Sequence, residues 1–477
     1  MLMLFPRERP EYPEGYAPSG DEAVFSLDRK PDRTAVTVRV TRPEGTAQGE
    51  TQVESRLLDE APERVYHTLQ HALKMAFYRA GTAVLGQEPP WGALTGVRPV
   101  KLPTRAMLGG KTPEEARAEL EREYRVSPSR AQLAVDCARA SLAARDSLRP
   151  DEVSLYVGIP FCPTRCAYCS FVSNSVEKSF HLVEPYLEAL LAEVDSAAEL
   201  VRDLGLRIKS FYMGGGTPTT LTAEQMDRLL GRLNDKFDMS HTVEYTVEAG
   251  RPDTITAEKL AALRRNGVTR VSINPQSMDD RVLAAIGRRH TADDIRRAME
   301  LVAAADFPHV NMDLIAGLPE DSPEGFRRSL DEVIAMGADD ITVHTLSLKK
   351  GSRITLEGTR LPAVEEVAAM LDYADGTLRG AGFAPYYLYR QKYMSGSFEN
   401  VGWCRPGGVG WYNIYIMEEL HSILSLGAGG STKMVDSARQ RIERVFNLKY
   451  PQEYIQRPEK VRENQRAFRA FYENGGK

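Results

Sequence analysis

Apolar and polar positions alternate in short runs over the first third of the chain. Strand-like alternation covers residues 23–27, 34–40 and 51–58. Helical periodicity follows over 62–79, 112–126 and 127–148, with a connector rich in glycine and proline at 86–103. The pattern therefore predicts a small α+β part at the N-terminus, residues 1–147.

From about Val153 onward, apolar β-rich runs alternate with helical stretches. The expected strands cover 153–159, 208–213, 242–249, 270–276, 309–317 and 339–347. The expected helices cover 183–205, 222–237, 256–267, 291–305 and 322–337. Such a repeat favours a parallel sheet, because each connection is a right-handed crossover. We therefore predict an α/β fold, a partial (β/α)6 TIM-like barrel over residues 148–385.

The pattern is less regular after Leu361. A helix is expected over 362–382, and aromatic and glycine-rich runs occupy 385–394 and 399–413. The last ~45 residues are charged and are expected to be helical. Residues 386–477 are therefore predicted to form a C-terminal region that covers the substrate and ends in helices.

Composition narrows the class of protein. The 477 residues are 42% hydrophobic and 27% charged, which is typical of a globular chain of two or three domains. The net charge of −5 and the lack of a long basic run argue against nucleic-acid binding. No run of ~18 apolar residues predicts a membrane span, and the apolar start is too short for a signal peptide. We expect a cytoplasmic monomer.

Three of the five cysteines, Cys162, Cys166 and Cys169, follow a C-x3-C-x2-C spacing. Chance clustering and a zinc site are two interpretations, but structural zinc normally takes four ligands, and no second C-x2-C exists. A 4Fe-4S cluster is the third interpretation. It normally takes four thiolates, so three would leave one iron open for another ligand. Cys137 and Cys404 are isolated, and Cys137 is expected to be a buried structural thiol.

Other polar and glycine residues follow the predicted strands, where β/α barrels carry their active sites. The cysteine loop follows the first strand and "GGGTPT" follows the second. Glu248 ends the third strand, Gln276 ends the fourth and Asp313 lies in the fifth. Glycines let a backbone approach a ligand closely, and the guanidinium of Arg288 suits a carboxylate. A plain turn, a surface carboxylate at Glu248 and competition from Arg289 are the simpler alternatives.

The cysteine spacing on the loop after the first barrel strand resembles that of the radical S-adenosylmethionine superfamily. The resemblance implies a 4Fe-4S cluster on Cys162, Cys166 and Cys169, whose open iron binds the methionine part of S-adenosylmethionine. It also implies the residues that contact this cofactor: Tyr168 at the adenine; Gly214, Gly215, Gly216 and Thr217 at the methionine amino group; Glu248 and Gln276 nearby; Arg288 at the methionine carboxylate; and Asp313 at the ribose.

The stretches "LYVGIPFC", "GGGTPT", "RVSINPQS" and "DLIAGLP" together resemble the oxygen-independent coproporphyrinogen III oxidases, also called dehydrogenases. Tyr156 matches a tyrosine that this family places near the cluster, and the resemblance gives it the catalytic role. The flanking segments, such as "PPWGALTGVRPVKL" and "GAGGSTK", resemble the HemZ-type branch. The chain departs from the best-studied branch at Phe171, where that branch has a fourth cysteine, and at the glycine of "YVGIPFC", where it has histidine.

The resemblance implies oxidative decarboxylation of coproporphyrinogen III to protoporphyrinogen IX, in porphyrin and haem biosynthesis, by a 5′-deoxyadenosyl radical. The implied partners are the tetrapyrrole and an external one-electron donor and acceptor. The substrate carries four carboxylates, so basic residues are expected at the barrel mouth. The candidates are Lys349, Lys350, Arg353, Arg390 and Lys392, for which solvated surface charge is the alternative. Trp403 and Trp411 are candidates to stack on a tetrapyrrole or to pack in the core.

Two other functions share this scaffold. A haem chaperone is marked by an H-N-x-x-Y motif, and the nearest stretch here, "WYNIYI", lacks the histidine and the spacing. A methyltransferase that binds two cofactors shares the core motifs, and the sequence leaves it open.

Overall fold

The structure is a computed structural model that describes residues 4–5, 11, 20–169, 174–347, 360–391 and 395–475. It divides into two compact units, Met1–Val135 with Gly396–Phe398 and Asp136–Ser395 with Glu399–Lys477. The three-part division expected from the sequence, with boundaries after residues 147 and 385, stays a prediction. No helix in the described ranges is both long and apolar enough to cross a membrane.

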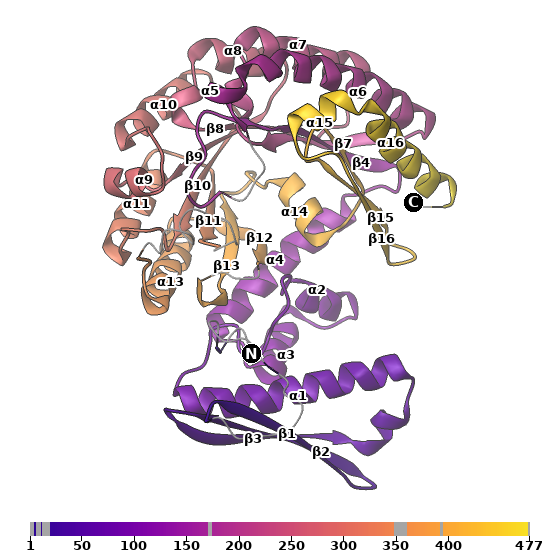
Figure 1. The fold of residues 1–477 in the computed structure, drawn as a ribbon, viewed down its shortest axis with the longest axis vertical. Helices are drawn as coiled ribbons and strands as arrows, with labels where there is room; N and C mark the ends of the chain where they lie inside the picture. The colour runs from indigo at the N-terminus through magenta and orange to yellow at the C-terminus, as the bar shows by residue number, and fades with distance from the viewer. Residues whose placement is uncertain are drawn as a thin grey trace. The chain divides into compact units, whose positions relative to one another are not determined.

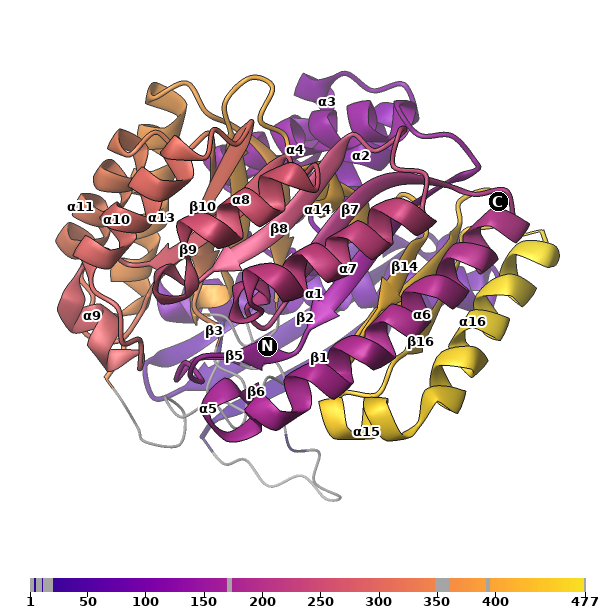
Figure 2. The ribbon, with the colours of Figure 1, turned by 90° about the horizontal axis from the view of Figure 1, so that it is seen from above.

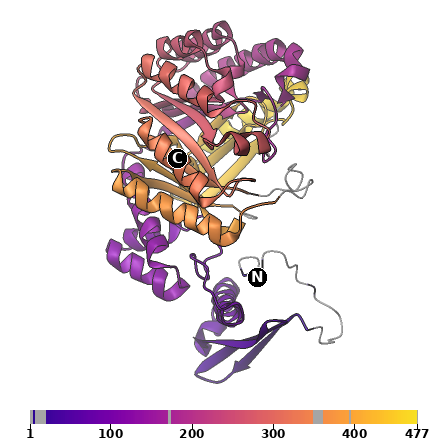
Figure 3. The ribbon, with the colours of Figure 1, turned by 90° about the vertical axis from the view of Figure 1, so that its left-hand side faces the viewer.

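The first unit contains an antiparallel sheet of β1 (Glu22–Arg29), β2 (Arg33–Arg42) and β3 (Gly45–Glu54), with β2 in the middle. The alternation in β2 buries Val36, Val38 and Val40 against α1 (Pro62–Leu85), which covers one face of the sheet (Figure 3). A Cβ on Gly49 would overlap the backbone of α1, so the glycine allows this close packing.

Further helices follow in this unit: η1 (Ser55–Asp59), α2 (Lys101–Leu108) and α3 (Pro113–Tyr124), with α4 (Pro128–Asp146) leading into the second unit. Two expectations differ from the structure. The third strand covers 45–54 rather than 51–58, because the chain turns into η1 at Ser55. The predicted connector at 86–103 also contains the first residues of α2, which begins at Lys101.

The second unit confirms the predicted α/β fold. Six parallel strands lie side by side in the order of the chain: β4 (Glu152–Ile159), β7 (Arg207–Gly215), β8 (Glu244–Gly250), β9 (Arg270–Gln276), β10 (His309–Ala316) and β11 (Asp340–Thr345). Their helices are α6 (Val183–Asp203), α7 (Ala223–Lys236), α8 (Ala257–Arg265), α9 (Asp280–Ala285), α10 (Ala292–Ala304), α11 (Pro323–Ala335) and α13 (Val364–Gly380). Short elements at the strand ends are β5 (Phe161–Cys162), β6 (Asn174–Ser175), α5 (Val176–Ser179), η2 (Phe180–Leu182), η3 (Pro218–Thr220) and η4 (Pro252–Thr254).

The sheet is open, and within the described residues no closed barrel forms. Five more strands extend it: β12 (Ala384–Arg390) and β13 (Glu399–Cys404) beside β11, and β14 (Ile423–Leu426), β15 (Ser431–Asp436) and β16 (Arg441–Phe446) beside β4. The expectation that the last ~45 residues are helical is therefore wrong for 433–446. Long-range pairing outweighs the charge of this segment, because β15 is buried along most of its length and pairs with both β14 and β16.

The chain ends in two helices, α15 (Pro451–Gln456) and α16 (Pro458–Glu473), that pack along α6 (Figure 2). The other helices from α6 to α13 cover the outer side of the curved sheet, whereas α14 (Trp411–Glu418) lies on its inner side (Figure 1). The backbone N–H of Tyr412, in α14, donates to the carboxylate of Glu244, in β8, at 3.0 Å. The inner space of the sheet is therefore partly filled by a segment from the C-terminal part of the chain.

A buried ion pair joins β9 to β11 on this inner side. Arg270 Nη1 donates to Asp340 Oδ2 at 2.8 Å, and the two side chains are only 4% and 1% exposed. Arg270 Nη2 also donates to the carbonyl of Gly408 at 2.8 Å, and the hydroxyl of Tyr386 donates to Asp340 at 3.0 Å. Each charge therefore has several partners, as a buried ion pair requires.

Removing one partner of this pair should destabilise the second unit strongly. The substitution Arg270→Met is expected to lower the free energy of unfolding by about 3–5 kcal/mol, because Asp340 then stays buried without its partner. Arg228→Met is the control, since Arg228 bonds Glu184 and Glu188 on the outer surface, where about 0–1 kcal/mol is expected. Urea unfolding followed by tryptophan fluorescence measures both, and equal losses would contradict the role given to the buried pair.

Candidate functional site

A cavity of about 640 Å³ opens in the second unit at the carboxyl ends of the parallel strands. Its volume is in the range that holds small-molecule ligands. All predicted site residues except Gly214 line it: Tyr156, Cys162, Cys166, Tyr168, Cys169, Gly215, Gly216, Thr217, Glu248, Gln276, Arg288 and Asp313. The structure therefore brings together residues that the sequence spreads over more than 150 positions.

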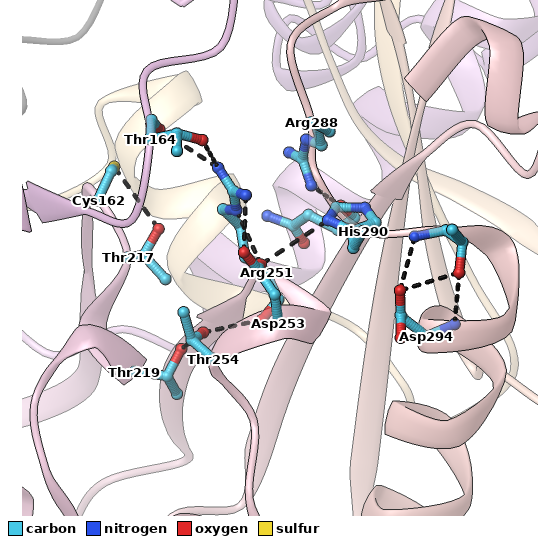
Figure 4. A network of polar contacts seen from close by, with 12 residues as sticks. Cys162, Thr164, Thr217, Thr219, Arg251, Asp253, Thr254, Arg288, His290 and Asp294 are labelled. Carbon is cyan, nitrogen blue, oxygen red and sulfur yellow. Dashed lines mark hydrogen bonds and ion pairs between the residues drawn. The ribbon is translucent and has the colours of Figure 1, made fainter. Parts of the chain in front are cut away.

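The glycine motif at the end of β7 lies directly against the strand that carries the first cysteine. The Gly216 amide donates to the carbonyl of Ile159 at 2.8 Å, and the Thr217 amide donates to that of Phe161 at 2.7 Å. A Cβ on Gly216 would overlap the Phe161 carbonyl, so only glycine allows this approach. The Thr217 hydroxyl lies 3.6 Å from the sulfur of Cys162 (Figure 4).

Gly214 contributes to the site because it has no side chain. A Cβ there would lie 2.9 Å from the carboxyl carbon of Glu248 and from the ring of Tyr212. The glycine therefore leaves room for the Glu248 side chain at the cavity wall rather than lining the cavity itself.

The three loop cysteines are partly exposed and line the cavity, whereas Cys137 and Cys404 are buried away from it. In the ranges that the structure describes, no three histidine, cysteine or acidic side chains converge on a point where they could hold one metal ion. A 4Fe-4S cluster needs no such point, because each thiolate binds a different iron. Phe171 lies outside the described residues.

Arg288 lies in the cavity wall, while Arg289 is exposed. Arg288 donates to the backbone carbonyl of Asn274 at 2.6 Å and to the hydroxyl of Tyr168 at 3.0 Å. Within the described part of the chain, Arg288 Nε and Asn274 Oδ1 are buried and have no hydrogen-bond partner. Buried polar atoms normally have partners, so these two atoms are groups that a polar ligand would satisfy.

Glu248 has a perturbed acidity. Burial raises its pKa to about 7, although the Tyr212 hydroxyl, which donates to Glu248 Oε1 at 2.5 Å, acts in the opposite direction. Asp313 nearby raises the pKa further. Near neutral pH this carboxyl group is therefore partly protonated and can donate as well as accept a hydrogen bond.

Gln276 and Asp313 lie on neighbouring strands. Gln276 has a φ of 70°, which is rare for a residue other than glycine and is found where a binding site requires it. Asp313 Oδ1 accepts a hydrogen bond from Asn311 at 2.8 Å, and its other oxygen lies 3.7 Å from His344 Nε2. Asp313, Asn311 and His344 therefore form a polar group on the cavity wall.

Three tyrosines form a stack beside Glu248. The rings of Tyr156 and Tyr212, which pair in register on β4 and β7, are 6.3 Å apart, and Tyr412 lies 4.6 Å from Tyr212. All three rings are within 20° of parallel. Tyr156, the predicted catalytic residue, thus lies in an aromatic wall of the cavity.

Several residues that line the cavity were not predicted from the sequence: Tyr212, Arg251, Asn274, Asn311, His344 and Tyr412. His344 could have been found by the signal that identified Asp313, because both are titratable side chains in apolar strands. Tyr212 has the inward register of Tyr156 and precedes Gly214 by two positions. Tyr412 had no local signal, because its place depends on where α14 folds.

The residues proposed to bind the carboxylates or the rings of the substrate are partly buried away from the cavity and partly outside the described residues. Arg390 is buried and does not line the cavity. Lys349, Lys350, Arg353 and Lys392 lie outside the described residues. Trp403 is 2% exposed, and Trp411 packs against a buried cluster that contains Tyr415. Core packing is therefore the role of both tryptophans.

The acidity of Glu248 gives a pH-dependent prediction. A raised pKa means that the fold favours the protonated carboxyl, so this contribution to stability is full below pH 4.5 and is lost as pH rises through about 7. Because glutamine mimics the protonated form, Glu248→Gln should gain stability over the parent protein by about 1–3 kcal/mol between pH 5 and pH 8.

Urea unfolding of cluster-free protein at both pH values measures this difference. Glu199→Gln, on the exposed side of α6, controls for the loss of one negative charge. A constant difference between Glu248→Gln and the parent protein across this pH range would contradict the assignment.

Comparison with known proteins agrees with the geometry. A model of the Radical SAM superfamily matches residues 156–333, which contain the cysteine loop and every other predicted site residue. The solved structure of coproporphyrinogen III oxidase (HemN) from Escherichia coli, a radical SAM enzyme, superposes with a TM-score of 0.53 at 24% identity. That match covers 69% of this chain and 73% of HemN, and it shows that the two share a fold.

Curated relatives extend the match. The heme chaperone HemW of Mycobacterium tuberculosis is 33% identical over 54% of this chain and 64% of its own length. The oxygen-independent coproporphyrinogen-III oxidase-like protein HemZ of Bacillus subtilis is 38% identical over 84% of this chain and 81% of its own length. The second match includes the regions on both sides of the superfamily core. The chain therefore belongs to the radical SAM superfamily and, within it, to the oxygen-independent coproporphyrinogen III oxidase-like family that includes HemZ.

Proposed function

We propose that this chain oxidatively decarboxylates the propionate side chains of coproporphyrinogen III and so produces protoporphyrinogen IX. One observation carries the proposal: the three loop cysteines, the glycine motif and Arg288 line one cavity, in a chain that resembles HemZ over most of its length. Membership of the superfamily implies a 4Fe-4S cluster and S-adenosylmethionine. The unpartnered buried atoms of Asn274 and Arg288 in the cavity wall are consistent with a polar cofactor there.

In this proposal Cys162, Cys166 and Cys169 would hold the cluster, and S-adenosylmethionine would bind to it in the same cavity. Bound together, the two groups supply a 5′-deoxyadenosyl radical that can remove a hydrogen atom from a substrate carbon. The propionate then loses carbon dioxide and one further electron, which an external acceptor takes, and a vinyl group remains. Two such events give the product.

The protein residues position the reactants and keep out water. Arg288 Nε and the amide oxygen of Asn274 are the polar atoms available to the methionine part of the cofactor. Glu248, kept partly protonated by burial, can donate a hydrogen bond where an ionised carboxylate could not. The stacked rings of Tyr156, Tyr212 and Tyr412 give the cavity an apolar wall that restricts water beside the reacting carbon.

Charge indicates how a porphyrinogen would lie. Glu244, Glu248, Asp313 and Asp340 all line the cavity, and Arg270 is already bound to Asp340. Such a wall disfavours free carboxylates. The propionates that do not react should therefore point away from this wall, toward the open mouth of the cavity.

Haem binding without turnover is the second candidate, because HemW proteins are among the relatives. HemW of Escherichia coli is 27% identical over 64% of this chain. The stretch nearest to the chaperone motif, "WYNIYI", forms α14, where Tyr412 is buried in the tyrosine stack. That this stretch lacks the histidine and the spacing of the chaperone motif is what supports the decarboxylase over the chaperone.

An anaerobic assay distinguishes the candidates. The reconstituted protein is incubated with S-adenosylmethionine, dithionite and coproporphyrinogen III, and the products are separated by chromatography. We expect protoporphyrinogen together with 5′-deoxyadenosine. Deoxyadenosine without a vinyl product would reject the decarboxylase, a methylated product would favour a methyltransferase, and stable haem binding without turnover would favour the chaperone.

The ligand assignment has its own test. Cys166→Ser should abolish the brown absorption and most of the bound iron, because two thiolates hold a 4Fe-4S cluster poorly. Cys404→Ser is the matched control, since Cys404 is buried in β13 and does not line the cavity. Colour and iron that survive in Cys166→Ser would mean that the ligand assignment is wrong.

A further inference from the structure

Two buried arginines hold the cysteine loop, one on each half. Arg288 donates to the hydroxyl of Tyr168, between the second and third cysteines. Arg251 reaches the other half. Its Nη1 donates to the hydroxyl of Thr164 at 2.6 Å and to the carbonyl of Thr164 at 3.3 Å, between the first and second cysteines (Figure 4).

The position of Arg251 follows from a tight turn at the end of β8. Gly250 has a φ of 66°, and the Arg251 amide donates back to the carbonyl of Ala249 at 2.8 Å. Glu248 therefore faces the cavity wall, and three residues later the side chain of Arg251 reaches the cysteine loop. The guanidinium is almost fully enclosed, since Arg251 is only 3% exposed.

Asp253 fixes the plane of this guanidinium. Arg251 Nε donates to Asp253 Oδ1 at 2.9 Å, and Nη2 donates to Oδ2 at 2.8 Å. Two parallel hydrogen bonds of this kind orient arginine in a way that lysine cannot reproduce. Although burial acts against it, the nearby His290 and the hydrogen bonds from Arg251 lower the pKa of Asp253, so the carboxylate stays charged. The Nη1 group is thereby aimed at Thr164.

The clamp of Arg251, Asp253 and Thr164 lies beside two hollows. Arg251 lines the main cavity, and Asp253 lines a second hollow of about 430 Å³. Thr164 lines both. Thr164 thus lies between two hollows lined by described residues. The hydrogen bonds from Arg251 are the contacts that hold it from the end of β8.

We propose that Arg251 is a positioning residue that holds the cysteine loop in its cluster-binding conformation. Asp253 orients the guanidinium of Arg251, and Thr164 accepts its hydrogen bonds. This inference rests on the proposed function, because it assumes that the loop cysteines bind the cluster. It adds a role for a residue that touches none of the expected reactants. The fork geometry is essential to it, so a lysine that keeps only the charge should fail.

Thiol labelling of the cluster-free protein tests the proposal directly. The reduced protein is treated with iodoacetamide under nitrogen, and the labelling of each cysteine is followed by mass spectrometry. Arg251→Lys is expected to speed labelling of Cys162 and Cys166 about tenfold, because charge-assisted hydrogen bonds to the loop are lost. Cys137 and Cys404 are buried internal references and should label at unchanged rates.

Arg265→Lys is the matched control. Arg265 also bonds both carboxylate oxygens of an aspartate, Asp227, but it does so on the outer surface, where its side chain is 53% exposed. It should leave all five labelling rates unchanged. Equal labelling of Cys162 and Cys166 in Arg251→Lys and in the parent protein would overturn the proposal.

Thr164→Val decides the question if Arg251→Lys unfolds and labels all five cysteines. Valine keeps the size of threonine and removes the hydroxyl acceptor, so loop labelling should rise about threefold, with the buried references unchanged. If Arg251→Lys stays folded, the two effects should be less than additive in the double variant, since both substitutions remove the same contact. Fully additive effects, or no effect of Thr164→Val, would overturn the clamp.

A second readout uses the cluster itself. In Arg251→Lys a chelator should extract iron from the reconstituted protein about tenfold faster than from the parent protein or Arg265→Lys. The two proposals fail separately. A parent protein that binds the cluster but makes no vinyl product rejects the decarboxylase alone, whereas equal labelling and equal iron loss in an active protein reject the positioning role alone.

Discussion

The site depends on one close backbone approach, between the end of β7 and the strand that leads into the cysteine loop. Two amide hydrogen bonds, from Gly216 and Thr217, tie these segments together, and no side chain on Gly216 would fit between them. Gly214, two residues earlier in the chain, leaves room for the side chain of Glu248. The glycines thus set both where the cysteines begin and where the acidic wall of the cavity lies.

Around that contact, charged side chains hold loops and strands in place, and aromatic rings form part of the cavity wall. The three buried arginines that line the cavity each have a partner: Arg270 bonds Asp340, Arg251 bonds Asp253 and Arg288 bonds Tyr168. The tyrosine stack supplies an apolar wall where the carboxylates do not. Arg251 and Arg270 thus hold the protein's own loops and strands, whereas Arg288 keeps its Nε without a partner among the described residues.

Local signals in the sequence predicted the alternating core, the cysteine loop and the strand-end residues from Glu248 to Asp313. Local signals did not predict the segments whose position depends on contacts with residues distant in the sequence. β15 and β16 form because the sheet offers them partners, with β16 at the edge, although their charge resembles that of a surface helix. Tyr412 enters the site because α14 folds inside the sheet, and Arg251 enters it through a partner, Thr164, that lies 87 residues away in the chain.

The pairing of β14 with β4 has a consequence for how the chain matures. Until residues 423–426 arrive, the strand that leads to the cysteines is the edge of the sheet, with unpaired backbone groups. Pairings so distant in the chain form late, after much of the chain entropy has been lost. The nascent protein therefore exposes an unpaired strand edge beside the cysteine loop until residues 423–426 have been made.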